Sequence, residues 1–240
     1  MKKIFTAVLL AGVVVANAQE NEKPNMVKLN ATALALGNIQ LGYERVITKR
    51  LSIAVNTGIL AKGNIPYASS FNLDEDLRNL TIQGNTFTLE PRFYVGKKGY
   101  GKGFYVTPYY RYSQYKVDNF KYDMELYPMQ KEPIHITGKV RGHSGGLMIG
   151  SQWFLGKKRN IVLDAWFIGA HYGISKGELN GRTERKLNVI EQQEAKKELD
   201  NFVDIPLIKY NSNVSENGAN IKIDGPWAGI RGGLSIGYKF

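Results

Sequence analysis

The chain has 240 residues, with 32 Lys and Arg against 21 Asp and Glu, a formal net charge of +11 at pH 7, and no cysteine. This length fits one domain with one core. The lack of cysteine excludes disulfide bonds, a catalytic thiolate and a lipid anchor on a cysteine.

The N-terminus has the pattern of a secretory signal peptide. Lys2 and Lys3 precede an apolar run over residues 4–16, and Ala16-Asn17-Ala18 offers small residues for cleavage. The run is shorter than the roughly 18 to 20 residues that a membrane helix needs. We therefore predict a signal peptide over residues 1–18 and a mature domain over residues 19–240. Because an exported protein does not routinely meet nucleic acid, the positive charge favours anionic lipid headgroups, acidic glycans or partner proteins.

After the signal peptide, apolar and polar side chains alternate with the period of two that is typical of β-strands. Leu51, Ile53 and Val55, for example, share one face, and Ser52 and Asn56 lie opposite. The predicted strands cover residues 26–36, 39–47, 51–60, 86–95, 104–127, 132–156, 161–176 and 226–240. Connections after even-numbered strands are all short, whereas two of those after odd-numbered strands are long loops, about residues 61–85 and 177–225.

These features predict an all-β fold, an eight-stranded antiparallel up-and-down transmembrane β-barrel. Both termini and the short turns then lie in the periplasm, and the long loops are extracellular. The fourth to seventh strands exceed the roughly 9 to 11 residues of a tilted membrane strand, so extended hairpins project outward, most of all around residues 128–130. Aromatic residues near the periplasmic rim suit the bilayer interface: Tyr43, Phe93, Tyr94, Phe104, Tyr105, Trp153, Tyr238 and Phe240.

The polar faces of the strands carry charged side chains that this register directs into the lumen. The lumen of an eight-stranded barrel is filled by side chains, so charges there must be paired. We interpret them as a structural ion-pair plug, with a gated polar path for small ions as the alternative. The predicted luminal charges are Lys28, Glu44, Glu90, Arg92, Arg111, Asp164, Arg231 and Lys239.

The last strand ends with Leu234, Ile236, Tyr238 and Phe240 on one face. We expect these four side chains to face lipid, and the strand to pair with residues 27–35 to close the sheet. The same residues are the predicted assembly signal.

Chemistry beyond this framework has little support in the sequence. His143 and Ser144 are adjacent, so on a strand they point to opposite faces and cannot form a catalytic pair. We expect no catalytic residue, no cofactor and no metal site, and a lipid A- or phospholipid-modifying enzyme is the least favoured function. In the last long loop, Asn188 and Glu191 predict a helix through about Leu199, which either packs on the barrel mouth or docks a partner.

Several segments carry a family likeness: "ANAQE", "LGYERVITKRLSIAVNTGI", "LEPRFYVGKKG", "VTPYYRY" and "GLSIGYKF". The chain resembles small outer-membrane β-barrel proteins typical of the Bacteroidota, including a family catalogued only as a domain of unknown function. The resemblance implies a barrel akin to the transmembrane domain of outer membrane protein A, and a terminal strand that the barrel-assembly machinery reads. It brings no known activity.

We therefore expect a cell-envelope protein with a structural or surface-interaction role, for example as an accessory subunit of an envelope complex. A narrow ion or small-solute channel is the alternative. The expected partners are outer-membrane lipid and lipopolysaccharide, the assembly machinery during biogenesis and an envelope protein, with no nucleic acid.

Overall fold

The computed structural model describes residues 24–64, 80–97, 99–127, 130–202 and 209–240. The predicted signal peptide, residues 1–18, lies outside these residues. The elements are β1 (Asn25–Asn30), α2 (Ala31–Ala35), β2 (Asn38–Val46), β3 (Leu51–Asn64), β4 (Thr81–Tyr94), β5 (Gly103–Tyr127), β6 (Gln130–Leu155), β7 (Ile161–Thr183), α4 (Val189–Phe202), β8 (Lys209–Ser215) and β9 (Gly218–Lys239).

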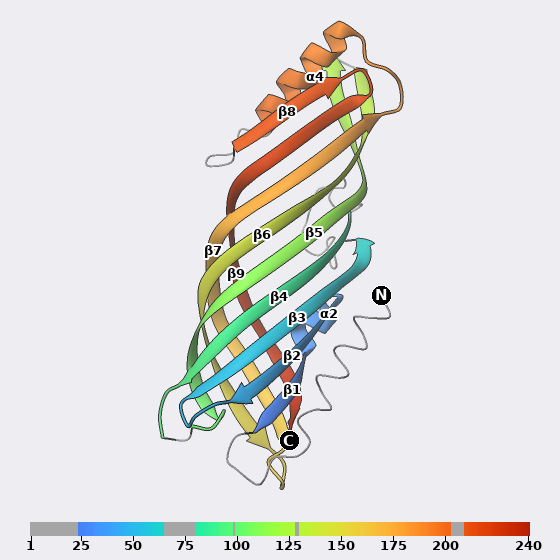
Figure 1. Ribbon diagram of the computed structural model, residues 1–240. Coiled ribbons are helices and arrows are strands. Elements are labelled where there is room, and N and C mark those ends of the chain that lie inside the picture. The colour runs from blue at the N-terminus through green and yellow to red at the C-terminus, as the bar shows by residue number, and fades with distance from the viewer. Residues whose placement is uncertain (1–23, 65–79, 98, 128–129, 203–208) are drawn as a thin grey trace, which may run out of the picture.

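The described strands form one antiparallel up-and-down sheet that closes on itself (Figure 1). Neighbours in sequence pair from β1 to β7, then β7 pairs with β9, and β9 pairs with β1. Eight of the nine described strands thus make a ring, and β8 pairs with the first part of β9, from Gly218 to Asp224, away from the part that pairs with β1. The predicted pairing of the last strand with the first is confirmed for Met26–Asn30, which face Ser235–Lys239.

The prediction of a continuous first strand over residues 26–36 is wrong, because residues 31–35 form the short helix α2. Asn30 caps this helix, since its side-chain oxygen accepts a hydrogen bond from the backbone N–H of Ala33 at 2.8 Å. Alanine favours helix over strand, so a run in which alternate residues are alanine satisfies the strand pattern without strand propensity. Thr32 in turn accepts a hydrogen bond from the backbone N–H of Leu234 on β9.

The strands extend further than predicted into both long loops. β3 continues to Asn64 and β4 begins at Thr81, so of the loop predicted at 61–85 only residues 65–79 lie outside the described part. In the segment predicted as a loop at 177–225, β7 continues to Thr183, and α4, β8 and the start of β9 follow. β5 and β6 pair as far as Tyr127 and Gln130, and residues 128–129, at the centre of the predicted projecting hairpin, lie outside the described residues.

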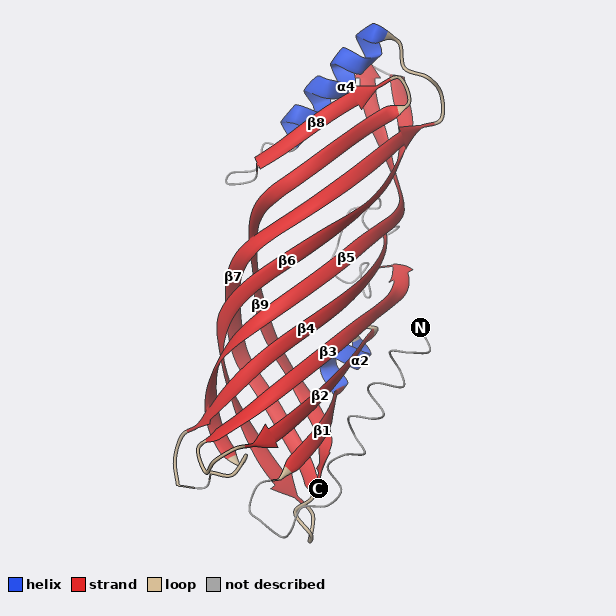
Figure 2. Cartoon of the chain, viewed as in Figure 1, coloured by secondary structure: helices blue, strands red, loops and turns tan. Residues whose placement is uncertain are grey.

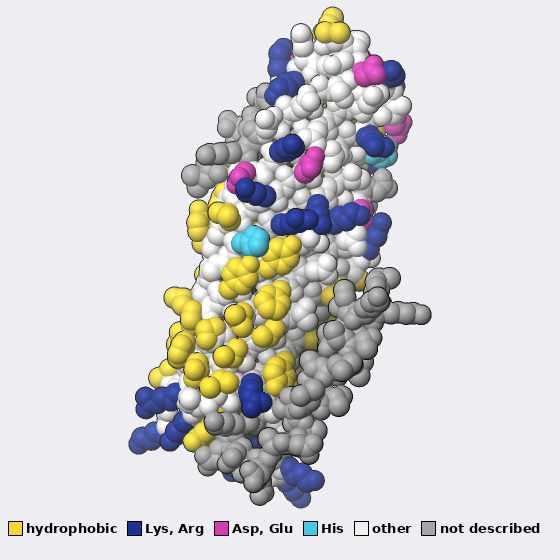
Figure 3. Space-filling view, in the orientation of Figure 1, with side chains coloured by type: hydrophobic (Ala, Val, Ile, Leu, Met, Phe, Trp, Pro, Cys, Tyr) yellow, Lys and Arg dark blue, Asp and Glu magenta, His cyan; other side chains and the backbone are white. Residues whose placement is uncertain are grey.

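The outer face of the ring carries many large, exposed apolar side chains. In Figure 3 they gather in a zone that crosses the strands, with Lys and Arg at both of its borders. We call these side chains the belt: Val27, Leu29, Ile39, Leu41, Tyr43, Ile53, Ile59, Phe87, Leu89, Phe93, Phe104, Tyr110, Leu147, Trp153, Leu155, Ile161, Phe167, Ile168, Tyr172, Ile174, Ile230, Leu234, Ile236, Tyr238 and Phe240. The alternation of each strand sends the polar neighbours of these residues inward.

Beyond the belt, the ends of β5, β6, β7 and β9 form a second region with β8 and α4, which we call the distal extension (Figure 2). Its apolar side chains face inward, where α4 covers them between β5 and β8. The buried cluster contains Met124, Leu126, Ile134, Leu187 and Ala195.

The predicted helix of the last long loop is confirmed as α4, which runs to Phe202. It begins with a reciprocal capping box. Asn188 Oδ1 accepts from the backbone N–H of Glu191 at 2.9 Å, and Glu191 Oε2 accepts from the backbone N–H of Asn188 at 2.8 Å. None of the described helices is long and apolar enough to cross a membrane.

Candidate functional site

The lumen of the ring holds a cluster of charged side chains that come from four different strands. Lys28 lies on β1, Glu44 on β2, Arg92 on β4 and Asp164 on β7. Each side chain lies on the inward face of its strand and is buried, with at most 4 % of the residue's surface exposed. Residues far apart in sequence therefore meet at one level because the sheet is closed.

Arg92 is the centre of the cluster. Its Nη1 donates to Glu44 Oε2 at 2.9 Å and to Asp164 Oδ2 at 2.7 Å. Its Nη2 donates to Glu90 Oε2 at 2.7 Å. One guanidinium thus contacts three carboxylates, which uses the several donors of its planar fork.

Lys28 joins two of the same carboxylates from the other side. Its Nζ lies 2.7 Å from Asp164 Oδ2 and also contacts Glu44 Oε2. The third contact of this ammonium group is the side-chain oxygen of Gln152. Gln152 in turn donates to the backbone carbonyl of Gly101, so the turn between β4 and β5 is tied to the cluster.

Neutral hydroxyl groups complete the coordination of the carboxylates. Tyr94 donates to Glu44 Oε1 at 2.7 Å, and Tyr105 donates to Asp164 Oδ1 at 2.8 Å. Ser52 also donates to Glu44. We predicted that Tyr94 and Tyr105 lie at the bilayer interface. This prediction is wrong, because both rings are buried in the lumen. Their position is set by strand alternation, which places Tyr94 on the same face as Arg92.

Arg231 of β9 extends the cluster along the lumen toward the distal extension. Its Nη2 donates to Glu90 Oε1 at 3.1 Å, and its guanidinium lies 4.7 Å from the ring centre of Tyr109 and 4.9 Å from that of Trp166. Lys28, Arg92 and Arg231 thereby balance Glu44, Glu90 and Asp164. We call these six residues the luminal network. Its equal numbers of positive and negative groups offset the cost of removing each charge from water.

Two of the predicted luminal charges lie apart from this network. Arg111 donates to Thr88 Oγ1 at 3.3 Å, and Lys239 lies over the ring of Phe154, 5.0 Å from its centre. The other six come together in it. Gln152, Ser52, Tyr94 and Tyr105 were not among the predicted residues, although the alternation that places Glu44 and Arg92 inward also applies to them.

An apolar layer lies between the network and the end of the ring where the two termini of the described chain meet. Met26, Val46 and Val162 are fully buried there, and Tyr100 and Phe154 pack against them. At Gly101, an added Cβ would lie 2.6 Å from the methyl group of Met26. The lumen is therefore filled with side chains at this level.

The histidines are distributed over both faces of the sheet. His143 is exposed and bonds Tyr110 at 2.7 Å, whereas the neighbouring Ser144 is buried and donates to the carbonyl of Arg111. His171 bonds Tyr109 at 3.1 Å, and His135 lies 3.2 Å from Glu184. Among the described residues, no group of three or more His, Cys, Asp or Glu could hold a metal ion.

The four residues of the predicted assembly signal are all exposed on the outer face. Leu234, Ile236, Tyr238 and Phe240 alternate there with the inward-facing Ser235 and Gly237. Their strand pairs with β1 on one side and β7 on the other.

Comparison with curated proteins and with solved structures found no significant match. One family does match, over residues 4–196, and its description is "Protein of unknown function (DUF3575)". This match spans most of the chain, from the N-terminal segment through β7 and into α4. The chain therefore belongs to this family of unknown function.

Proposed function

We propose that the mature chain is an integral outer-membrane β-barrel of eight strands, with a structural or surface-interaction role and a lumen closed by ion pairs. The observation that carries this proposal is the reversal of polarity along the strands. In the ring, the exposed apolar side chains of the belt face outward and the charges of the luminal network face inward. In the distal extension, the apolar cluster faces inward. Such a reversal is expected where one part of a sheet faces lipid and the other faces water.

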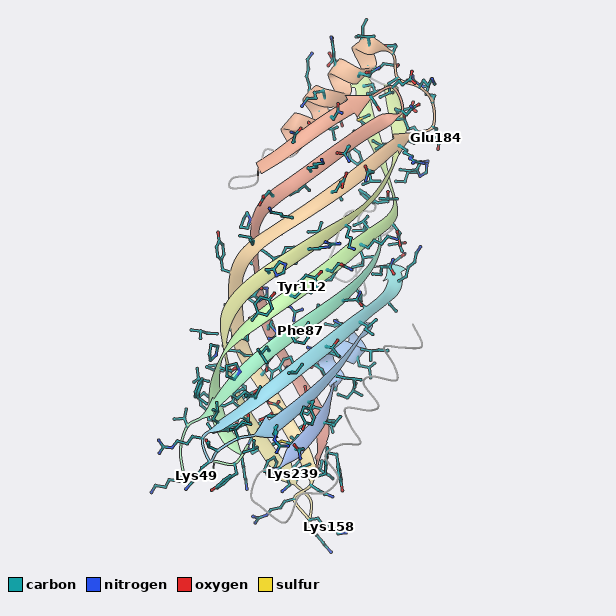
Figure 4. The ribbon with its side chains drawn as sticks, in the orientation of Figure 1. Lys49, Phe87, Tyr112, Lys158, Glu184 and Lys239 are labelled. Carbon is teal, nitrogen blue, oxygen red and sulfur yellow. The ribbon has the colours of Figure 1, made fainter. Side chains whose placement is uncertain are left out.

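The borders of the belt support the same proposal. The short connections of the ring carry exposed basic residues, among them Lys49, Lys97, Lys157 and Lys158. Figure 4 shows Lys49 and Lys158 at the end of the sheet opposite Glu184, with Phe87 and Tyr112 between. In the proposed orientation the basic end and both termini are periplasmic, and the distal extension is extracellular. Lipid, lipopolysaccharide and the assembly machinery are the partners that follow from this placement.

A membrane-fractionation experiment tests the proposal. The full chain is expressed in a Gram-negative host, and the outer membrane is separated on a density gradient. We expect the protein in that fraction, resistant to carbonate extraction, with a gel mobility that changes on boiling. Recovery as an extractable periplasmic protein would refute it. Removal of Phe240 is expected to reduce the inserted amount, because the terminal strand is the proposed assembly signal.

The proposed surface role is supported by the start of α4. Val189 and Ile190 expose 70 % and 59 % of their surface although the opposite side of the helix packs on the extension. We infer that these residues contact another envelope protein. Affinity purification from gently solubilised membranes should recover a stoichiometric partner, and replacement of both residues by Ser should release it.

Conductance measurements separate this proposal from the channel alternative. The buried layer of Met26, Val46 and Val162 supports a closed lumen. We expect no discrete conductance steps from the purified protein in planar bilayers, and reproducible steps would favour the channel.

A further inference from the structure

Two rows of charged side chains cross the outer face of the sheet immediately beyond the belt. In the first row, Arg141 of β6 faces Lys176 of β7, and Lys176 faces Asp224 of β9. In the second, Lys139 faces Glu178, and Glu178 faces Lys222. The neighbouring row toward the belt is His143, Ile174 and Pro226. Because residues on one face recur every second position, the first charged row lies only about 7 Å from Ile174.

These rows place like charges directly opposite one another. Arg141 is paired with Lys176, and Lys116 of β5 is paired with Lys139. Like charges at directly opposed positions of an antiparallel pair are destabilising. Carboxylates relieve part of this repulsion: Lys116 forms an ion pair with Asp118 at 2.9 Å, Asp224 lies 3.7 Å from Lys176, and Glu178 accepts a hydrogen bond from Asn220.

The same residues line a groove on the outer surface. Its volume is about 640 Å³, and Lys139, Arg141, Lys176 and Lys222 line it together with Glu178 and Asp224. Four cations against two carboxylates leave the groove positive. Figure 3 shows Lys and Arg side chains gathered directly above the apolar zone on the face in view.

We propose that this groove binds the phosphate groups of a phosphorylated glycolipid in the outer leaflet. This inference rests on the proposed membrane location. A ligand that satisfies both surfaces must have a phosphate at Arg141 and Lys176 and hydrocarbon alongside Ile174 and Leu147, and a membrane lipid combines the two. Arg141 supplies a planar fork that suits phosphate oxygens, and the lysines supply point charges.

The test compares lipid A with the same lipid after enzymatic removal of its phosphates, each titrated onto the purified folded protein in detergent. Wild-type protein should bind the phosphorylated form more tightly, and added NaCl should weaken that preference. The variant with Lys139, Arg141, Lys176 and Lys222 replaced by Gln should lose at least about tenfold in affinity for it, since each basic residue near an anionic surface contributes roughly fivefold. Free inorganic phosphate should compete weakly.

A matched control removes four charges from the other border of the belt, through Gln at Lys49, Lys97, Lys157 and Lys158. This variant should bind lipid A as the wild type does. Equal loss in both variants would overturn the assignment of the groove, as would equal affinity of the wild type for the two lipid forms. Each variant is first tested for insertion into vesicles and for protease resistance there, and only protein that passes both tests is titrated with lipid. Failure of the wild type to insert would instead refute the proposed membrane location.

Discussion

The ring and the distal extension share β5, β6, β7 and β9, yet they are stabilised in opposite ways. In the ring, buried charges meet in the luminal network while the belt is exposed. In the extension, Met124, Leu126 and Ile134 are buried under α4 while lysines are exposed. Antiparallel strand pairing is therefore common to both regions, and they differ in which face carries the apolar side chains.

The largest effect should come from breaking the luminal network. Glu44→Ala leaves Lys28 and Arg92 short of a carboxylate, and we expect a loss of about 3–5 kcal/mol in the free energy of unfolding. Arg111→Ala is the matched control in the same lumen, because Arg111 contacts Thr88 rather than a carboxylate of the network. Urea unfolding followed by tryptophan fluorescence measures both. Equal losses would contradict the distinction between the network and the rest of the lumen.

A charge placed on the belt should have the next largest effect. Leu147→Arg on β6 is expected to cost about 2–4 kcal/mol if that position faces the middle of a bilayer. Thr137→Arg is on the exposed face of the same strand in the extension, where water solvates the new charge. Folding titrations in lipid vesicles should show a large loss for the first variant and little change for the second.

Met124→Ala should act on the extension alone. It removes a buried side chain beneath α4 and should cost about 2 kcal/mol, the lower end for such a truncation, because the helix can settle into the space. We expect faster amide hydrogen exchange in α4 and β8, with no change in the heat resistance of the ring. A parallel fall in heat resistance would show that the two regions unfold as one unit.

Loss of the cap of α4 should be milder. Asn188→Ala removes the acceptor for the backbone N–H of Glu191 and should cost about 1 kcal/mol. Exchange should accelerate in the first turn of α4 and remain slow in β6. Asn188→Asp, which keeps an acceptor, should retain most of the protection.

The smallest effect should be a pH dependence confined to the extension. Arg185, and then the backbone N–H of Asn188, lower the pKa of Glu191 below its ordinary value of 4.5. Because the folded pKa is the lower one, this contribution is complete above about pH 4.5 and is lost as the pH falls through the folded value. Exchange in α4 should therefore accelerate on acidification, and Glu191→Gln should flatten that dependence. An unchanged profile in the variant would exclude this carboxylate as the cause.

Much of the ring follows from local alternation, since each strand needs only to separate two faces. Ala31–Ala35 is the exception, because alternate alanines match the apolar pattern of a strand although alanine favours helix. The extension was harder to predict because its polarity is the reverse of the ring's. A strand such as β7 therefore changes its apolar face partway along, and the segment beyond residue 176 resembles a loop.

The candidate site was predictable in its membership and not in its contacts. Alternation indicates that Lys28 and Asp164 both face inward, but their meeting depends on closure of the sheet between β1 and β9. Gln152, Tyr94 and Tyr105 were missed for a related reason. Amide and phenol groups are also compatible with rim and surface positions, and only the register of the closed ring places them beside a carboxylate.

The short length of β1 has a mechanical consequence. Its register with β9 involves Met26–Asn30, with Asn25 and Phe240 exchanging two further backbone hydrogen bonds, whereas β7 pairs with β9 from Ile161 to Arg182. Under a pulling force on the N-terminal side, β1 should be the first strand to rupture. Lys28 resists this rupture, because its side chain links β1 across the lumen to Asp164 on β7 and Gln152 on β6.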